Sequence, residues 1–395
     1  MTPSAAWIID VLLVLLLLAS LVWGYRSGLA RSAFALAGLV LGSVAAVLAV
    51  PVVITWVPAL EWRTPAALAT VLVLVVGAAA LGVQIGERLR RGLRRTPLRF
   101  VDRGLGAVGA LVVSALAVSM LAAGVGALGV PFLAQPLATS VVLRAIDTTT
   151  PPIVDGALAR LRASVLTDGL PVIVDAFGGR APEIPDVATT TPALQASARS
   201  VVRVTGTAYA CGQNQSGSGV VIAPGRVITN AHVVAGVTEP VVETPLDGAR
   251  TGRIVYFDPV DDLAVIAVDG LPTAPLPLGA DLTSGSPAVV DGYPFGGPFR
   301  SHSAEVVDRG ARPVADIYGR ATAPRDIYTL AADIQQGESG GALLDEAGAV
   351  VGIIFAKGAT TPDVGYALAL SEVAPVISGA PSFDAGVPAG ECIPG

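Results

Sequence analysis

The sequence predicts a multi-domain protein: a four-span α-helical membrane domain at residues 1–130, a connector at 131–197, and an all-β, double-barrel domain at 198–395. Composition indicates the membrane domain, because 52% of the residues are hydrophobic and 14% charged, against roughly 25% charged in soluble domains. After about Ser200, short β-type runs alternate with glycine and proline. That pattern is typical of a barrel or sandwich.

Four apolar runs in the first domain approach the roughly 20 residues needed to cross a bilayer. A cleaved signal peptide has one short run, so four in succession predict a membrane domain that is retained. The runs are Ala6–Tyr25, Leu29–Val53, Pro65–Val83 and Leu105–Gly126.

Arginines predict the orientation of these spans. Arg26 and Arg31 separate the first two runs, seven arginines lie within 88–103, and the middle gap holds only Glu61 and Arg63. Because positively charged loops stay in the cytoplasm, we expect both ends of the domain, and everything after it, to be extracytoplasmic. A nucleic-acid patch is the alternative for the arginine cluster, and its place between two spans argues against that.

The connector combines two segments with helical spacing, 141–146 and 153–165, with a Pro- and Thr-rich stretch from Gly178 to Pro192. Such a stretch indicates a domain boundary and an exposed cleavage target.

Eleven short β-type runs follow, and about 190 residues with that strand number suffice for two six-stranded barrels. They are Val201–Thr205, Gly219–Ile222, Arg226–Asn230, Arg253–Asp258, Leu263–Val268, Ala288–Gly292, Ser303–Arg309, Tyr328–Ile334, Ala342–Leu344, Val350–Ala356 and Val364–Leu370.

The chain has two cysteines, Cys211 and Cys392, and both lie in the β-rich domain. An even number in an extracytoplasmic domain is most simply explained by one disulfide. It would close a loop of about 180 residues, worth about 4–5 kcal/mol in the chain-entropy model. The alternative is two free, buried thiols.

One of only two histidines, His232, lies about a hundred residues before Ser339, which is set in Gly-Glu-Ser-Gly-Gly (337–341). A serine hydroxyl needs a neighbouring base to become a nucleophile, and a neutral imidazole serves this purpose near pH 7. Asp262 precedes an apolar strand and is placed to orient the imidazole. The N–H groups of Gly337 and Ser339 are expected to form an oxyanion hole.

Each of these features has a simpler explanation when taken alone: a glycine-rich loop, a histidine at a strand end, and a solvated carboxylate. Together, and in this order within one β-rich domain, they predict a serine endopeptidase. The second histidine, His302, has no motif around it and is expected on the surface or in a loop. The sequence shows no cofactor or metal-ligand motif, so we expect neither group.

Four motifs carry a resemblance to the chymotrypsin-fold proteases of the bacterial HtrA and trypsin-like group, over residues 198–378. They are Thr-Asn-Ala-His-Val-Val (229–234), Asp-Leu-Ala-Val (262–265), Gly-Tyr-Pro-Phe-Gly (292–296) and Gly-Glu-Ser-Gly-Gly (337–341).

This resemblance implies a double β-barrel with the active site in the cleft between barrels. It implies Asp262 rather than Asp261 as the acid, since in this group the acid directly precedes Leu-Ala-Val. Two departures stand out: no PDZ domain is expected after the protease domain, and Glu338 stands where HtrA proteases usually have asparagine.

The resemblance also suggests two roles near the serine. Asp333, six residues before Ser339, stands where the trypsin fold places the base of its S1 pocket, which would favour Arg or Lys substrates; a structural role is the alternative. Glu338 stands where trypsin-like zymogens use an acid to receive a new N-terminus. Cleavage within 178–199 would then activate the enzyme, and an ordinary salt bridge is the alternative.

The N-terminal domain resembles the CvpA (colicin V production) family, through Trp-Ile-Ile-Asp (7–10) and Gly-Tyr-Arg-x-Gly-Leu (24–29). Asp10 is expected at the membrane interface, with an ion pathway as the alternative. A CvpA-like domain fused to such a protease resembles mycobacterial membrane-anchored, acid-resistance proteases, which implies a role in envelope, acid or oxidative stress.

The net charge of the β-rich domain indicates which classes of binding partner to expect. From Ala188 onward the chain has 11 basic and 21 acidic residues, a net charge near −10, which argues against nucleic acid. We expect protein substrates in the cell envelope; the oligomeric state is left open. Two other functions stay open: a catalytically silent scaffold that binds envelope proteins, and a transport or secretion factor regulated by its protease domain.

Overall fold

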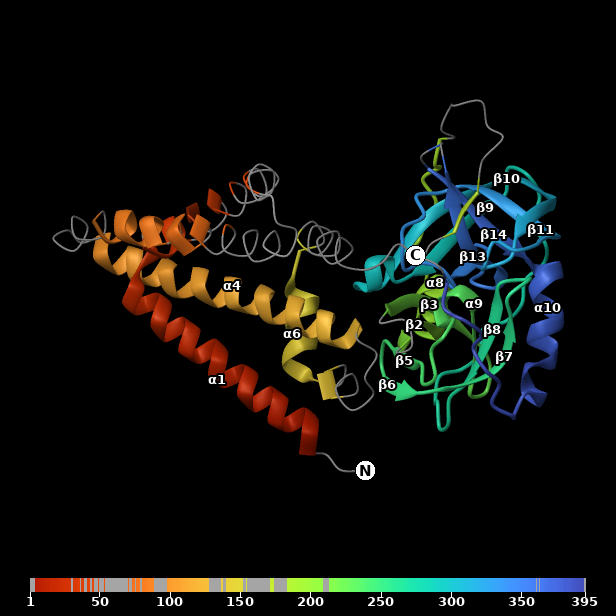
Figure 1. Cartoon of the computed structure of the whole chain (residues 1–395), viewed down its shortest axis with the longest axis horizontal. Helices are drawn as coiled ribbons and strands as arrows, with labels where there is room; N and C mark the ends of the chain where they lie inside the picture. Colours follow the sequence, from red (N-terminus) through yellow and green to blue (C-terminus); the bar gives the residue numbers. More distant parts are fainter. Residues whose placement is uncertain are drawn as a thin grey trace. The chain divides into compact units, whose positions relative to one another are not determined.

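The computed structural model describes residues 4–29, 98–127, 183–208, 213–359 and 363–393 continuously, and parts of 31–88 and 136–173 together with Thr361. The chain divides into two compact units, residues 10–118 and the remainder. The first unit is helical and the second contains the β-sheets (Figure 1).

The helical unit contains α1 (Ser4–Ser27) and α4 (Leu98–Ala127). Within the described residues, two helical stretches are long and apolar enough to cross a membrane, Trp7–Ser27 and Phe100–Ser119. The predicted second and third spans lie partly outside the described residues, and the residues described there are helical. Four spans therefore stay a prediction.

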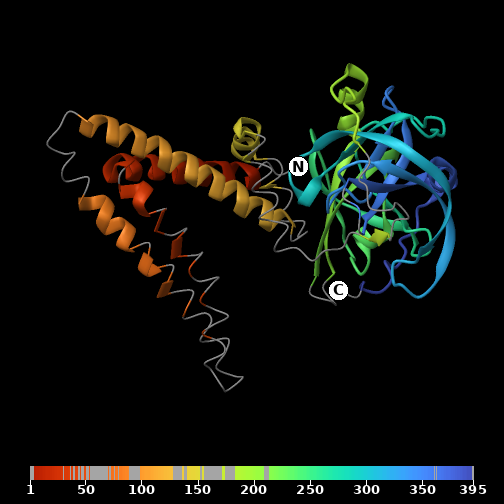
Figure 2. The same ribbon diagram turned by 90° about the horizontal axis from the view of Figure 1, so that it is seen from above.

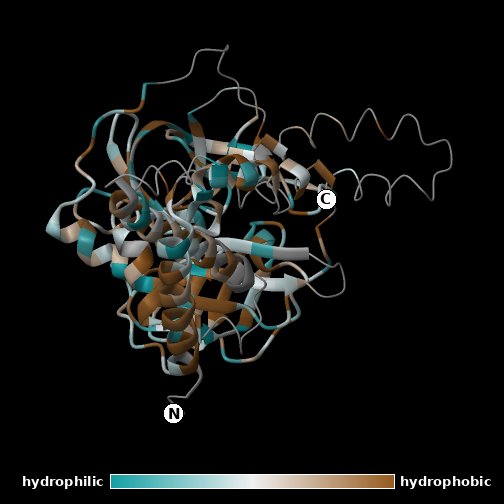
Figure 3. Ribbon diagram, turned by 90° about the vertical axis from the view of Figure 1, so that its left-hand side faces the viewer, coloured by the Kyte–Doolittle hydropathy of each residue, from teal (hydrophilic) through white to brown (hydrophobic). Residues whose placement is uncertain are grey.

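The side chains of α1 face outward to an unusual degree for a soluble protein. Trp7 is 66% exposed and Leu12 59%, and much of the helix is coloured as hydrophobic in Figure 3. Large apolar surface of this kind marks contact with a membrane or another protein.

Helices α1 and α4 approach each other closely where both carry small residues (Figure 2). A Cβ atom added at Gly24 would overlap the carbonyl oxygen of Gly106 and the Cβ of Ala110. Small residues at a helix crossing allow this backbone contact and are typical of membrane helix pairs.

Three short elements precede the sheets. Helix α6 (Val141–Thr149) has its first turn capped by Ser140, whose Oγ accepts the Leu143 N–H at 3.1 Å. Strand β1 (Val172–Ile173) and helix α8 (Pro192–Ser197) follow. The first predicted connector helix is confirmed, while most of 153–165 lies outside the described residues.

The β-rich unit contains two sheets of seven strands. The order of the first is β6-β5-β2-β3-β4-β8-β7, and that of the second is β1-β13-β12-β9-β10-β11-β14. The first comprises β2 (Val201–Ala208), β3 (Gln213–Ala223), β4 (Arg226–Thr229), β5 (Val241–Thr244), β6 (Gly248–Thr251), β7 (Arg253–Asp258) and β8 (Leu263–Ala267). The second adds to β1 the strands β9 (Pro287–Gly292), β10 (Arg300–Ala315), β11 (Thr322–Ala331), β12 (Ala342–Leu344), β13 (Val350–Gly358) and β14 (Val364–Ala369).

All eleven predicted strands are present, with longer bounds in several cases. Three others, β1, β5 and β6, were missed because two to four residues are too few to show alternation. The expected pair of six-stranded barrels is only partly matched. The second sheet closes on itself, since β13 pairs with both β12 and β14, whereas the pairings of the first run open from β6 to β7.

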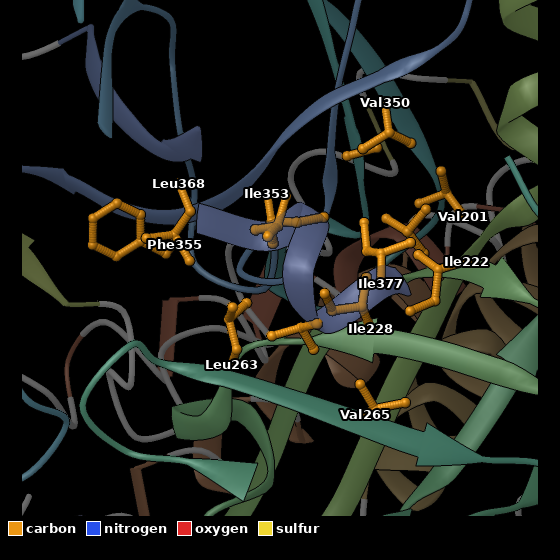
Figure 4. Packing of buried hydrophobic residues seen from close by; sticks show 14 of the residues in the cluster. Val201, Ile222, Ile228, Leu263, Val265, Val350, Ile353, Phe355, Leu368 and Ile377 are labelled. Atoms are coloured by element: carbon orange, nitrogen blue, oxygen red, sulfur yellow. The ribbon is translucent and has the colours of Figure 1, made fainter. Parts of the chain in front are cut away.

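One hydrophobic core joins the two sheets. It combines Ile228 and Leu263 of the first sheet with Ile353 and Leu368 of the second, and Ile377 of helix α10 (Leu370–Gly379) packs on it (Figure 4). These side chains are at most 7% exposed, and each buried one stabilises the fold by about 1.5–3 kcal/mol. The shared core holds the facing ends of the two sheets at fixed positions.

Candidate active site

His232 lies just after a strand of the first sheet. Strand β4 ends at Thr229, Asn230 is the N-cap, and the single turn α9 (Ala231–Val234) carries the imidazole. The side chain of His232 is 4% exposed, so its rotamer is held by its surroundings.

Asp262 binds His232 through both carboxylate oxygens. Oδ1 accepts the main-chain N–H of His232 at 2.9 Å, and Oδ2 lies 2.8 Å from the ring Nδ1. The aspartate has the left-handed backbone angle φ of 56°, and the Asn230 side chain donates to its carbonyl at 2.9 Å. With Nδ1 donating to the carboxylate, Nε2 is the ring nitrogen that can accept a proton.

Asp261 is directed elsewhere. Its main-chain N–H donates to the Asp258 carboxylate at 3.1 Å, and burial, followed by the charge of Asp258, raises the pKa of its carboxyl group. The structure therefore brings Asp262, and not Asp261, to the histidine.

A buried cation lies behind this carboxylate. Arg325 of β11 is 1% exposed and its guanidinium lies 5.9 Å from the centre of the Phe355 ring. Burial lowers the pKa of Arg325, and the charge of Asp262 is the largest influence that opposes this. Arg325 is therefore a buried positive charge whose electrostatic surroundings include Asp262.

Ser339 lies in a tight turn before β12. Gly337 and Gly340 have φ of +92° and +82°, a conformation that L side chains rarely adopt. A Cβ at Gly340 would also overlap Ser218 and Thr229 of the first sheet. Glycine is required here by both backbone angle and space.

Ser218 of β3 ties this turn to the first sheet. Its N–H donates to the Ser339 carbonyl at 2.7 Å, and its hydroxyl donates to the Gly337 carbonyl at 2.8 Å. The same hydroxyl accepts the Tyr293 N–H at 2.9 Å. Sequence reasoning missed this residue, although the glycines of Gly-Ser-Gly (217–219), within β3, are a sign of close backbone approach.

Ser339 and His232 lie on neighbouring segments. A Cβ added at Gly217 would overlap the side chain of Val233, next to His232, and would lie 3.0 Å from the Ser339 carbonyl oxygen. Ser339 Oγ and His232 Nε2 are both buried, and neither has a hydrogen-bond partner among the described residues. Each is therefore available for chemistry.

Two main-chain N–H groups of the turn, those of Gly337 and Ser339, have no hydrogen-bond acceptor within the described part of the chain. Unpaired, closely spaced N–H groups next to a serine form a natural anion site. The N–H groups with main-chain acceptors are those of Glu338 to Gln335, Gly340 to Ile354 and Gly341 to Glu338.

The structure describes the other two predictions, the role of Asp333 and the disulfide, only in part. Asp333 is half-buried and its carboxylate accepts the side-chain N–H of Gln335. Cys392 is disulfide-bonded, while Cys211 lies outside the described residues. Their pairing stays a prediction.

His302 is not in a loop, contrary to expectation. It lies within β10, its side chain is 11% exposed, and Nε2 is 3.0 Å from Oε1 of the fully buried Glu338. Nothing in the sequence near His302 signals this pair, because its partner is 36 residues away.

Two family profiles match the chain. The trypsin-like peptidase domain matches residues 217–353, and the colicin V production protein matches residues 9–151. The first match contains all three residues of the site, and the second covers the helical unit.

Relatives match either nearly the whole chain or a part of it. Serine protease Rv3671c of Mycobacterium tuberculosis is 35% identical over 95% of each chain. The mitochondrial serine protease HTRA2 of Bos taurus is 34% identical over 39% of this chain and 33% of its own. A crystal structure of the active form of the Rv3671c protease, 35% identical, covers 56% of this chain and 100% of that one, with a TM-score of 0.51. This chain therefore belongs to the family of trypsin-like serine proteases that carry an N-terminal colicin V production domain.

Proposed function

We propose that this serine protease is a membrane-anchored, extracytoplasmic endopeptidase that uses Ser339 as nucleophile, His232 as general base and Asp262 as the orienting acid. The observation that carries the proposal is the bidentate bond of Asp262 to His232, together with the burial of His232 Nε2 and Ser339 Oγ without hydrogen-bond partners among the described residues. His232 then takes the Ser339 proton as Oγ attacks the scissile carbonyl, and returns it to the leaving amine.

The oxyanion of the tetrahedral intermediate is bound by the N–H groups of Gly337 and Ser339. The carbonyls that share peptide planes with these N–H groups are held in place: that of Gln336 accepts the Phe295 N–H, and that of Glu338 accepts the Gly341 N–H at 2.8 Å. Ser218 adds bonds to the carbonyls of Gly337 and Ser339 in the same turn. Removing one such donor in a related mechanism costs about 10²–10³ in kcat, so the alignment of the turn sets the rate.

A fluorophosphonate probe tests the mechanism on the full chain in detergent micelles. Labelling is expected in the wild type and is lost in Ser339→Ala, with strong loss in His232→Ala. Unchanged labelling of Ser339→Ala overturns the choice of nucleophile. A wild type that is never labelled, across pH and redox conditions, favours the silent scaffold.

Membrane anchoring is supported by the two apolar helices and their outward-facing side chains. The arginine distribution supports four spans with the protease outside. A membrane-impermeant maleimide tests this in intact cells: Glu346→Cys, exposed in the protease unit, is labelled, and Gly92→Cys in the arginine-rich loop is labelled only after lysis. The reverse pattern overturns the orientation.

The bridge between Cys211 and Cys392 is supported by the disulfide-bonded state of Cys392 and by the presence of two cysteines in all. A non-reducing peptide map finds the two cysteine peptides linked. Recovery of either as a free thiol overturns the pairing.

The proposals for substrate specificity and for the physiological role rest on the resemblance to the protease families. Asp333 favours basic P1 residues if it lines the S1 pocket, and its bond to Gln335 is the competing structural role. A peptide panel varied only at P1 separates the two, since indifference to Arg and Lys excludes the pocket role. A role in envelope, acid or oxidative stress predicts that cells with Ser339→Ala survive acidic medium less well than the wild type.

A further inference from the structure

Glu338, the residue before the nucleophile, is a charged group held from two sides in a fully buried position. Its Oε1 lies 3.0 Å from the His302 Nε2, and its Oε2 accepts the main-chain N–H of Gln335 at 2.7 Å. The side chain has 0% exposure. A buried carboxylate without partners is strongly unfavourable, so these two contacts determine where Glu338 lies.

The contact with Gln335 closes the turn that carries the active-site N–H groups. The main-chain N–H of Glu338 also donates to the Gln335 carbonyl, at 3.1 Å, and the carbonyl of Glu338 accepts from Gly341 at 2.8 Å. The peptide groups of Gly337 and Ser339 lie inside this bonded frame. A shift of Glu338 would therefore move both of the N–H groups assigned to the oxyanion.

His302 reaches this turn from a different part of the second sheet. It lies in β10, which pairs with β9 so that Ser301 is opposite Asp291. The titratable groups that face the imidazole are Glu338 and Asp291, which is also buried. Both of these neighbours are acids.

We propose that His302 is a positioning residue of the protease: by holding Glu338 in place, it keeps the N–H groups of Gly337 and Ser339 aligned for the transition state. This rests on the proposed oxyanion role of those two groups. His302 touches neither substrate nor nucleophile. It also occupies the carboxylate oxygen that a new N-terminus would have to bind, so activation by N-terminal capture requires displacement of His302 or Gln335.

The test is steady-state kinetics of the full chain in micelles, with the active fraction measured by fluorophosphonate titration. His302→Ala is expected to lower kcat per active site by about tenfold, with KM within about twofold, because the N–H groups act mainly in the transition state. His302→Gln, which retains an N–H donor near the position of Nε2, restores most of kcat. Ser303→Ala, on the next residue of the strand, matches the wild type.

In one contrary outcome, His302→Ala lowers the fraction of molecules that the probe titrates, while kcat per active site is unchanged. That result assigns His302 a merely structural role and overturns the proposal. Unchanged kinetics in His302→Ala also overturn it. These outcomes differ from failure of the proposed function, in which the wild type itself is not labelled at Ser339.

A neutral background provides a test if His302→Ala does not fold. In Glu338→Gln, the group that contacts position 302 is a neutral amide, and His302→Gln and His302→Asn are compared there. Glutamine reaches the position of Nε2 and asparagine only that of Nδ1, so kcat is expected to be about tenfold higher with glutamine. Equal kcat values overturn the proposal.

Discussion

The main-chain N–H of Ser218 donates to the carbonyl of Ser339 at 2.7 Å, so the nucleophile, which belongs to the second sheet, is anchored to the first. The same strand region leads to β4 and His232. The proposed nucleophile and base are therefore both attached to the β3–β4 region. A shared support limits the small displacements of these groups that would lower the rate strongly.

Ser218→Ala is expected to lower kcat by about tenfold with little change in KM. The hydroxyl bond to Gly337 is lost and the Tyr293 N–H is left without its acceptor, which costs about 1–3 kcal/mol of stability for a buried donor. Steady-state kinetics and urea unfolding check both effects. Ser216→Ala is the matched control, because that buried hydroxyl, on the same strand, has no recorded partner among the described residues; an equal effect there refutes the specific role of Ser218.

Asp262→Asn is expected to reduce kcat by about 10³–10⁴, because the amide can stabilise the wrong imidazole tautomer. Asp261→Asn is its control and keeps kcat within about threefold, since Asp261 is directed away from His232. The rates are measured on a peptide substrate after active-site titration. If the two variants exchanged their effects, the assignment of the acid would be wrong.

Asp291→Asn is expected to stabilise the protein above pH 6. Burial raises the pKa of Asp291 from 3.8 to about 6, so the folded state holds a proton that the unfolded state releases between these values. Stability from this group is fully present below pH 4 and is lost as pH rises through about 6, a change of about 3 kcal/mol.

The variant removes this dependence. Unfolding by urea is followed from pH 4 to pH 7.5 in a Ser339→Ala background, which prevents self-cleavage, and the fall in stability over this range should be smaller with asparagine. An equally steep fall in both proteins contradicts the titration of Asp291.

Gly24→Leu is expected to separate α1 from α4. The added side chain meets the backbone of Gly106 and the side chain of Ala110, and overpacking of this kind costs about 1–3 kcal/mol or displaces a helix. Heat-induced aggregation in detergent detects the loss. Gly104→Leu is the control, because a Cβ there has no neighbour within 4 Å, and equal damage from both variants excludes a specific helix contact.

The residues that carry chemistry could be predicted from the sequence because each sits in a local motif. The strands were predictable for a similar reason, since alternation and glycine or proline boundaries are local signals. The acid that contacts His232 was harder to predict from the sequence. Asp261 and Asp262 are adjacent, and only the positive φ of Asp262, together with the contact from Asn230, directs one of them to His232.

The supporting residues could not be predicted, because their partners are distant in sequence. Ser218 acts on a turn 119 residues away and His302 on a residue 36 away, and such contacts depend on strand register in the folded sheet. A lone histidine without a motif gave no indication of a buried acid opposite to it. The open order of the first sheet likewise depends on β5 and β6, which are too short to be recognised.

The parallel pairing of β1 with the end of β13 has a mechanical consequence. Val172 lies opposite Lys357 and Ile173 opposite Gly358, while the carbonyl of Ile354, in the same strand β13, accepts the N–H of Gly340 beside the nucleophile. A force applied to residues 172–173 would therefore reach the turn that holds Ser339 through β13.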